Sequence, residues 1–266
     1  MPGPFSRSLP SKRIAAVNIL DPREPVSAWS HGTWLLISLP AFALLWRRGR
    51  GDFGKRVSLV VFGLSLTACF AGSTLYHGVR GSGERIAFFA LMDYIGIYLL
   101  IAGTYTPIAW NIMSGRWRLI VLTVAWLSAA AGIALQIGFN SLPPGLRTGL
   151  YLGLGWGAMF CYFDIARKVS HRAMRPFLAG GVFYSVGAVL NLLHWPVLWP
   201  GVFRAHELFH LFVMAGSLSH FWFILTVVAT FDPAAPPLRP PPALPEASHV
   251  RTRRPQWMSR LSRGVS

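Results

Sequence analysis

Residues 57–79 read VSLVVFGLSLTACFAGSTLYHGV, a run without Asp, Glu, Lys or Arg. The hydrocarbon core of a bilayer is about 30 Å thick, and a helix needs roughly 20 apolar residues to cross it. Because lipid offers no hydrogen bonds, the backbone of such a segment must bond to itself, as a helix does. The sequence therefore predicts a membrane-spanning helix here, with Ser73 and His77 near its C-terminal end.

The rest of the chain repeats this pattern. Of its 266 residues, 53% are hydrophobic and 13% are charged, and its mean hydropathy is +0.45. Soluble domains carry about 25% charged residues, so this composition argues against a soluble domain and excludes a disordered chain. Six further segments are long and apolar enough to cross: Pro25–Trp46, Ile86–Ile112, Leu119–Phe139, Thr148–Phe163 (extendable through Asp164), Pro176–Trp195 and a last one from Ala205 to Phe231. We predict an all-α membrane protein with seven transmembrane helices.

These spans define three regions of the chain. Residues 1–24 are a polar N-terminal segment without the features of a signal peptide, and residues 25–231 form the seven-helix domain. Residues 232–266 contain eight of the 20 Pro and six Arg, which predicts a disordered, basic tail. Within the fifth span, the four-residue spacing of Gly149, Gly153 and Gly157 predicts close helix packing.

The basic residues predict an orientation and an anionic membrane partner. The net charge is +16, from 25 Lys and Arg against 9 Asp and Glu; in a membrane protein this favours anionic lipid over nucleic acid. With seven spans, the loops on the N-terminal side carry Arg80, Arg85, Arg147 and Arg204. The opposite loops carry Arg47, Arg48, Arg50, Lys55, Arg56, Arg116, Arg118, Arg167, Lys168, Arg172 and Arg175. The positive-inside rule then predicts a cell-membrane protein with a cytoplasmic C-terminus.

Polar side chains within the spans gather toward the N-terminal side. His31 begins the first span, Ser73 and His77 end the second, and Asp93 lies early in the third. His194 ends the sixth span, and His206 and His210 begin the last. Ionisable residues inside a membrane are costly, so they indicate a functional site.

The spacing of three of these histidines predicts a metal centre. His206 and His210 are four residues apart and project from one helix face. With His77 they supply the three ligands of a catalytic zinc site, whose fourth position is left for water. Zinc lowers the pKa of that water to about 7, and Asp93 can orient or deprotonate it, with Ser73 on the face of His77. The alternative is a set of scattered histidines that hydrogen-bond between helices, the role we predict for His31 and His194.

The segment His206-Glu207-Leu208-Phe209-His210 also matches the H-E-x-x-H signature of zinc proteases, in which Glu is the base. The extended signature needs a glycine where Val213 stands and a third histidine where Gly216 stands. We therefore do not favour a protease.

Several motifs resemble a known family. They are Glu24-Pro25 followed by Ser30-His31-Gly32; Ser73-Thr74-Leu75-Tyr76-His77; Met92-Asp93-Tyr94 continuing to Ala102-Gly103-Thr104-Tyr105-Thr106-Pro107; and 206–210 followed by Ser219-His220-Phe221. Over about residues 22–231, the chain resembles the hemolysin III branch of the progestin and adipoQ receptor superfamily, which includes the adiponectin receptors. It is more distantly similar to alkaline ceramidases.

The resemblance implies a seven-helix fold with zinc on His77, His206 and His210, and with Asp93 holding the zinc-bound water, supported by Ser73. It assigns no base role to Glu207. It also implies the opposite orientation, because the adiponectin receptors place the N-terminus and the zinc side in the cytoplasm.

These observations predict a zinc-dependent, ceramidase-like hydrolase of lipid amides or esters, with a membrane lipid as substrate or ligand. One alternative is a membrane regulator or receptor with structural zinc. The other is a cytolytic protein, although no amphipathic pore-forming segment stands out.

Overall fold

The computed structural model describes residues 21–139 and 142–234. Apart from an isolated bridge between Trp199 and Phe203, their regular structure is helical. The helices are α1 (Pro25–Arg48), α2 (Phe53–Gly78), α3 (Gly83–Ile112), α4 (Gly115–Gly138), α5 (Pro144–Trp156), the 3₁₀ segment η1 (Gly157–Cys161), α6 (Tyr162–Val169), α7 (Arg175–Leu193), α8 (Ala205–Phe223) and the π-helical η2 (Ile224–Val228). Except for residues 21–24 and 232–234, the predicted polar segment and tail lie outside the described residues.

Among the described residues, six helices are long and apolar enough to cross a membrane. They are α1, α2, α3, α4, α7 and the continuous helix from Ala205 to Val228. They confirm an all-helical membrane protein and six of the seven predicted spans. Many large apolar side chains face outward, such as Leu36, which is 68% exposed. Such surfaces suit contact with lipid tails.

The fifth predicted span, Thr148–Phe163, is divided among α5, η1 and α6, none of which meets the criterion for a span by itself. Glycine is a poor helix former, and Gly153, Gly155 and Gly157 fall where the α-helix gives way to the 3₁₀ segment. The predicted close packing is wrong at Gly149 and Gly153, where an added Cβ would have no atom within 4 Å, whereas a Cβ on Gly157 would lie 3.1 Å from the Tyr105 hydroxyl oxygen.

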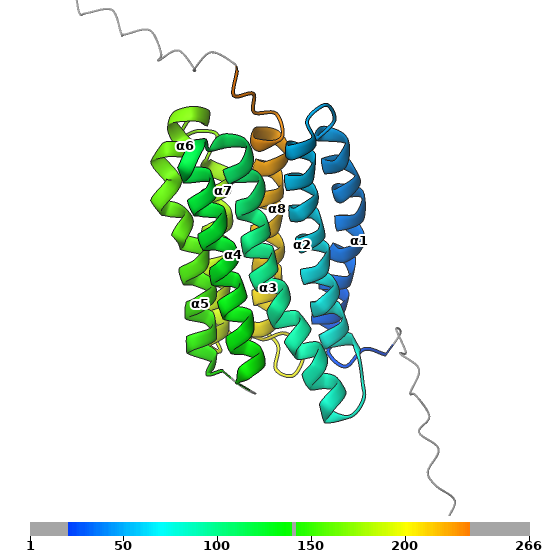
Figure 1. The fold of residues 1–266 in the computed structure, drawn as a ribbon. Coiled ribbons are helices and arrows are strands. Elements are labelled where there is room, and N and C mark those ends of the chain that lie inside the picture. Colours follow the sequence, from blue (N-terminus) through cyan, green and yellow to red (C-terminus); the bar gives the residue numbers. More distant parts are fainter. Residues whose placement is uncertain (1–20, 140–141, 235–266) are drawn as a thin grey trace, which may run out of the picture. The chain divides into compact units, whose positions relative to one another are not determined.

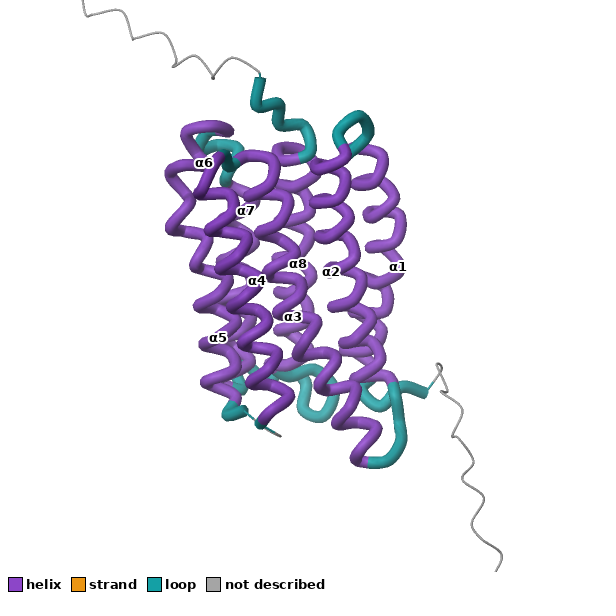
Figure 2. Tube along the Cα trace, in the orientation of Figure 1, coloured by secondary structure: helices purple, strands orange, loops and turns teal. Residues whose placement is uncertain are grey.

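Neighbouring helices in the sequence also pack together. The largest contacts are those of α2 with α1 and α3, and of α7 with α8. Figure 1 shows the described chain entering the bundle at one end, where α1 begins, and leaving it at the opposite end after α8. Figure 2 shows that the connections between helices lie at the two ends of the bundle.

Two glycines let α2 and α3 approach closely. A Cβ on Gly96 of α3 would lie 2.8 Å from the Cα of Cys69, and one on Gly72 of α2 would lie 3.0 Å from the carbonyl oxygen of Met92. Small residues allow this kind of helix approach in membranes. Gly72 is followed by Ser73, and Met92 is followed by Asp93, so the contact brings these two predicted site residues together.

Candidate metal centre

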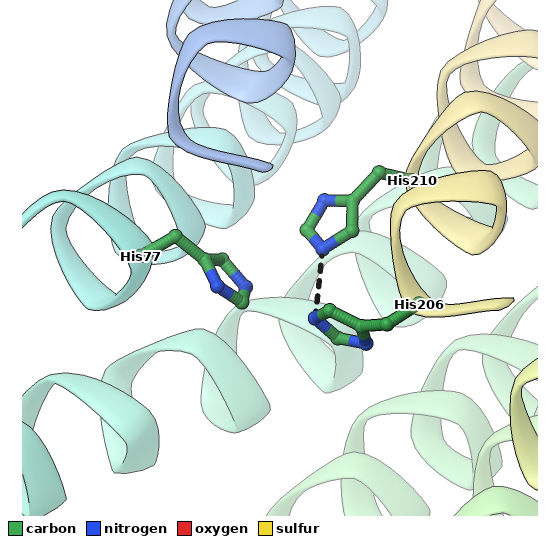
Figure 3. Close-up of side chains that lie close together, drawn as sticks. All are labelled: His77, His206 and His210. Atoms are coloured by element: carbon green, nitrogen blue, oxygen red, sulfur yellow. Dashed lines mark hydrogen bonds between the residues drawn. The ribbon is translucent and has the colours of Figure 1, made fainter. Parts of the chain in front are cut away.

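Three histidines from two helices converge at the end of the bundle where α1 begins. His77 is next to the last residue of α2, and His206 and His210 lie in the first turns of α8. Figure 3 shows the three imidazole rings pointing toward one another. One ring nitrogen from each lies within 4.8 Å of the other two, so the group can hold a metal ion. The predicted trio is therefore brought together by the fold.

The start of α8 is fixed by its own sequence. The Glu207 carboxylate accepts a hydrogen bond of 2.8 Å from the backbone N–H of Arg204, which caps the helix. His206 and His210 then follow on one face, with 3.1 Å between their Nε2 atoms. Glu207 therefore has a structural role in the H-E-x-x-H segment.

The other ring nitrogen of each histidine faces a partner outside the trio. His77 Nδ1 lies 2.5 Å from Glu24 Oε2, and His206 Nδ1 lies 3.3 Å from Asn191 Oδ1. His210 Nδ1 lies 2.7 Å from Nε2 of His31.

This pattern is a test of whether the residues fit a metal. Metal-ligating histidines characteristically donate their second ring N–H to an acceptor, which fixes the ring and the free lone pair. Here the three Nδ1 atoms are engaged outward, and His77 Nε2 is buried without a hydrogen-bond partner among the described residues. Three imidazole nitrogens that share one space suit zinc, so the residues fit the predicted cofactor.

Glu24 reaches His77 because the chain before α1 bonds to the end of α2. The backbone N–H of Glu24 donates to the His77 carbonyl at 2.9 Å, and that of Arg23 donates to the Gly78 carbonyl at 3.3 Å. Arg23 also pairs with the Glu24 carboxylate at 3.0 Å. The hydrogen bond with His77 lowers the pKa of Glu24, whose carboxyl group is outside the spans, and the charge of the Arg23 guanidinium acts in the same direction.

His31 and His194 lie outside the converging trio. His31 is buried and bonds to His210, so its predicted role between helices agrees with the structure. His194 follows α7 in a left-handed conformation, with φ of 54°, and lines the neighbouring cavity.

Asp93 and Ser73 lie beside the histidines. Both line a cavity whose wall also includes His206 and His210. Gly72, the neighbour of Ser73, packs against the backbone of Met92 and Asp93, where an added Cβ would lie 3.3 Å from the Asp93 nitrogen. The arrangement puts a carboxylate and a hydroxyl next to the candidate metal ligands.

The cavity is long and mainly apolar. Its volume is about 850 Å³, within the range of small-molecule sites. Along α3 the lining residues run from Asp93 to Met113 at the end of the helix, recurring every three or four residues and partly as adjacent pairs. This stretch is about 30 Å long at 1.5 Å per residue. The cavity therefore extends from the histidine end toward the opposite end of the bundle.

Glu24 and Asn191, which contact His77 and His206, were not among the predicted site residues. A signal for both was available, because each ligating histidine needs an acceptor for its second N–H. Glu24 stands just before a proline that begins the first span, and Asn191 is a polar residue near the end of the sixth span, one turn before His194.

Comparison with known proteins identifies relatives of the chain. A family model described as "Haemolysin-III related" matches residues 21–221. The chain is 31% identical over 208 residues to "Hemolysin-3" of Bacillus cereus, covering 77% of this chain and 91% of the relative. It is 29% identical over 204 residues to "Hemolysin-3 homolog" of Bacillus subtilis (strain 168), covering 76% and 92%. It is 27% identical over 202 residues to "Heptahelical transmembrane protein ADIPOR2" of Oryza sativa subsp. japonica, covering 65% and 82%.

Proposed function

The chain belongs to the haemolysin-III-related family of integral membrane proteins, and from this premise we propose that it is a zinc-dependent hydrolase of lipid amides or esters. The observation that carries the proposal is that two of the three clustered histidines, His206 and His210, line the same long apolar cavity as Asp93. A metal site, a carboxylate and space for an acyl chain then occur together.

The fold of this hydrolase has seven membrane crossings. Residues 144–169, which form α5, η1 and α6, supply the crossing that none of these helices makes alone. An odd number of crossings agrees with the entry and exit of the described chain at opposite ends of the bundle. The eleven basic loop residues opposite the histidine end then favour a cytoplasmic C-terminus.

His77, His206 and His210 hold the zinc through their Nε2 atoms, because their Nδ1 atoms face Glu24, Asn191 and His31. Zinc supplies Lewis acidity, which polarises a carbonyl and acidifies water. The protein fixes the rings through these outer partners, so the three lone pairs are aimed before the ion arrives.

Asp93 is the proton acceptor of the reaction. A carboxylate in a membrane span costs about 2.5–3.5 kcal/mol on insertion scales, and a neighbouring cation offsets that cost. Asp93 takes a proton from the attacking water and returns it to the leaving amine or alcohol as general base and then general acid. Ser73, which lines the same cavity, supports the Asp93 carboxyl group in this role.

The cavity defines the substrate class. Its α3 wall runs from Asp93 through apolar and aromatic positions to Met113, so the scissile bond lies at the polar end and the hydrocarbon chain along α3. The "Hemolysin-3" name belongs to a relative; we do not propose lysis, because no amphipathic pore-forming segment stands out in the sequence.

The test uses Asp93→Asn, which keeps size and hydrogen bonding but cannot take a proton. Purified protein in detergent is assayed for zinc content and for fatty-acid release from ceramides, glycerolipids and lysolipids. We expect zinc to remain and hydrolysis to fall on the order of 100-fold or more; Ser73→Ala should lose less.

A matched control is Asp164→Asn, a carboxylate in α6 that pairs with Lys168; it should leave both readouts unchanged. Full hydrolysis in Asp93→Asn would refute the base role. Zinc without hydrolysis of any lipid in the wild type would favour a regulator with structural zinc, and loss of zinc in Asp93→Asn would make Asp93 a ligand.

A further inference from the structure

Two of the three outer partners of the candidate ligands lie at the start of α1. Glu24, which precedes the helix, contacts His77, and His31 contacts His210. We propose that His31 is a positioning residue, which orients the His210 ring toward the metal. Together, His31 and Glu24 form what we call the α1 clamp: two contacts that hold metal ligands belonging to α2 and α8. This rests on the proposed zinc function.

His210 Nδ1 lies 2.7 Å from His31 Nε2. Metal binding requires a neutral His210 ring, and between two neutral rings one nitrogen carries the proton and the other accepts it. If His210 Nδ1 carries it, the His210 Nε2 lone pair is free to face His77 and His206. If His31 Nε2 carries it, the His210 proton sits on Nε2 and blocks ligation. An acceptor at position 31 therefore selects the binding tautomer of His210.

The surroundings of His31 fit this role. The side chain is 4% exposed, its ring packs edge-on against Phe70 at a centroid distance of 5.1 Å, and it meets the His210 ring at 4.0 Å. Its Nδ1 is buried without a hydrogen-bond partner among the described residues, as is Ser27 Oγ one turn earlier. The ring is held by packing with only its Nε2 engaged, which leaves His210 as the group that it orients.

The α1 clamp connects α1 with α8, two helices that otherwise make few contacts with each other. α1 packs mainly on α2 and makes far fewer contacts with α8. Two side-chain hydrogen bonds join α1 to α8 among the described residues: His31 to His210, and Trp34 Nε1 to Ser217 Oγ at 2.7 Å. Only the His31–His210 bond reaches a candidate ligand. The Trp34–Ser217 bond is therefore a matched control, because its loss weakens the packing of α1 on α8 without changing a ligand contact.

The experiment measures zinc affinity of the full-length protein in detergent, by competition with a fluorescent zinc chelator, alongside thermal stability. The variants are His31→Leu, His31→Gln, His31→Asn and Trp34→Phe. Loss of an outer partner typically weakens metal binding by 10–100-fold, which is the loss expected for His31→Leu. Gln places an acceptor oxygen near the position of Nε2, so His31→Gln should bind zinc within a few fold of the wild type.

Asn reaches only the position of Nδ1, so His31→Asn should be as weak as His31→Leu. This comparison between two folded polar variants keeps the test decisive if the leucine variant does not fold. Trp34→Phe should lower stability while leaving zinc affinity unchanged, as expected if only the His31 bond reaches the ligands.

Equal zinc affinity in wild type, His31→Leu and His31→Asn would overturn the positioning role and leave the hydrolase proposal standing. A parallel loss of affinity in Trp34→Phe would also overturn it, because α1 would then act through packing alone. Wild-type protein that binds no zinc would overturn both.

Discussion

Replacing Gly96 with Ala would test whether the close contact of α2 and α3 sets the position of Asp93. The added Cβ would lie 2.8 Å from Cys69 Cα, and 3.5 Å from Cys69 N and Cβ. Ordinary contacts fall between 3.4 and 4 Å, so α3 must move away from α2 by roughly 0.6–1.2 Å. Overpacking of this kind costs about 1–3 kcal/mol of stability.

The shift should separate metal binding from catalysis. Gly96 lies one turn after Asp93 on α3, whereas the three histidines lie on α2 and α8. A misplacement of about 1 Å can cost on the order of 100-fold in rate. We therefore expect Gly96→Ala to keep its zinc, to unfold at a lower temperature and to lose lipid hydrolysis by about that factor.

The assay is thermal unfolding in detergent together with zinc content and fatty-acid release. Gly83→Ala is the control, because it changes a glycine of the same helix whose Cβ would have nothing within 4 Å; it should match the wild type. If Gly96→Ala retained wild-type stability and activity, the close helix contact would not govern the placement of Asp93.

Three further predictions address other parts of the molecule. His194→Ala should keep full zinc by elemental analysis, since this residue lines the cavity outside the converging trio; loss of zinc would add it to the site. A fluorescent reporter fused after Phe231 should be bright and a periplasmic phosphatase fused there inactive; the reverse would place the zinc side in the cytoplasm. Lys55→Met should destabilise the protein by about 1–2 kcal/mol, because Lys55 Nζ donates to the carbonyls of Phe231 at 2.8 Å and Ala229 at 3.4 Å; unchanged thermal unfolding would contradict this.

The fold was predictable wherever a span is one uninterrupted apolar helix. The run 57–79 became α2 because length, lack of charge and the demands of lipid on the backbone all agree. The fifth span was harder, because hydropathy does not register the low helix propensity of Gly153, Gly155 and Gly157. Four-residue glycine spacing suggested packing there, yet Gly149 and Gly153 have open space beside them, whereas glycines without that spacing, such as Gly72 and Gly96, pack closely.

Part of the candidate site could be predicted from the sequence, and part could not. His206 and His210 share a helix face at fixed spacing, and alternating span direction brings His77 to the same end, so the trio followed from the sequence. The partners Glu24 and Asn191 did not, because their contacts depend on how the chain before α1 and the end of α7 lie against neighbouring helices. The residues that neighbour Glu24 and Asn191 in the sequence do not indicate these tertiary contacts.

The central claim is that His77, His206 and His210 hold one zinc ion. Anomalous diffraction from crystals of purified protein, recorded on both sides of the zinc absorption edge, tests it directly. We predict one zinc peak per chain, with the Nε2 atom of each of the three histidines at about 2.0–2.1 Å. A zinc peak elsewhere, or protein saturated with zinc that shows no peak among the three rings, would contradict it.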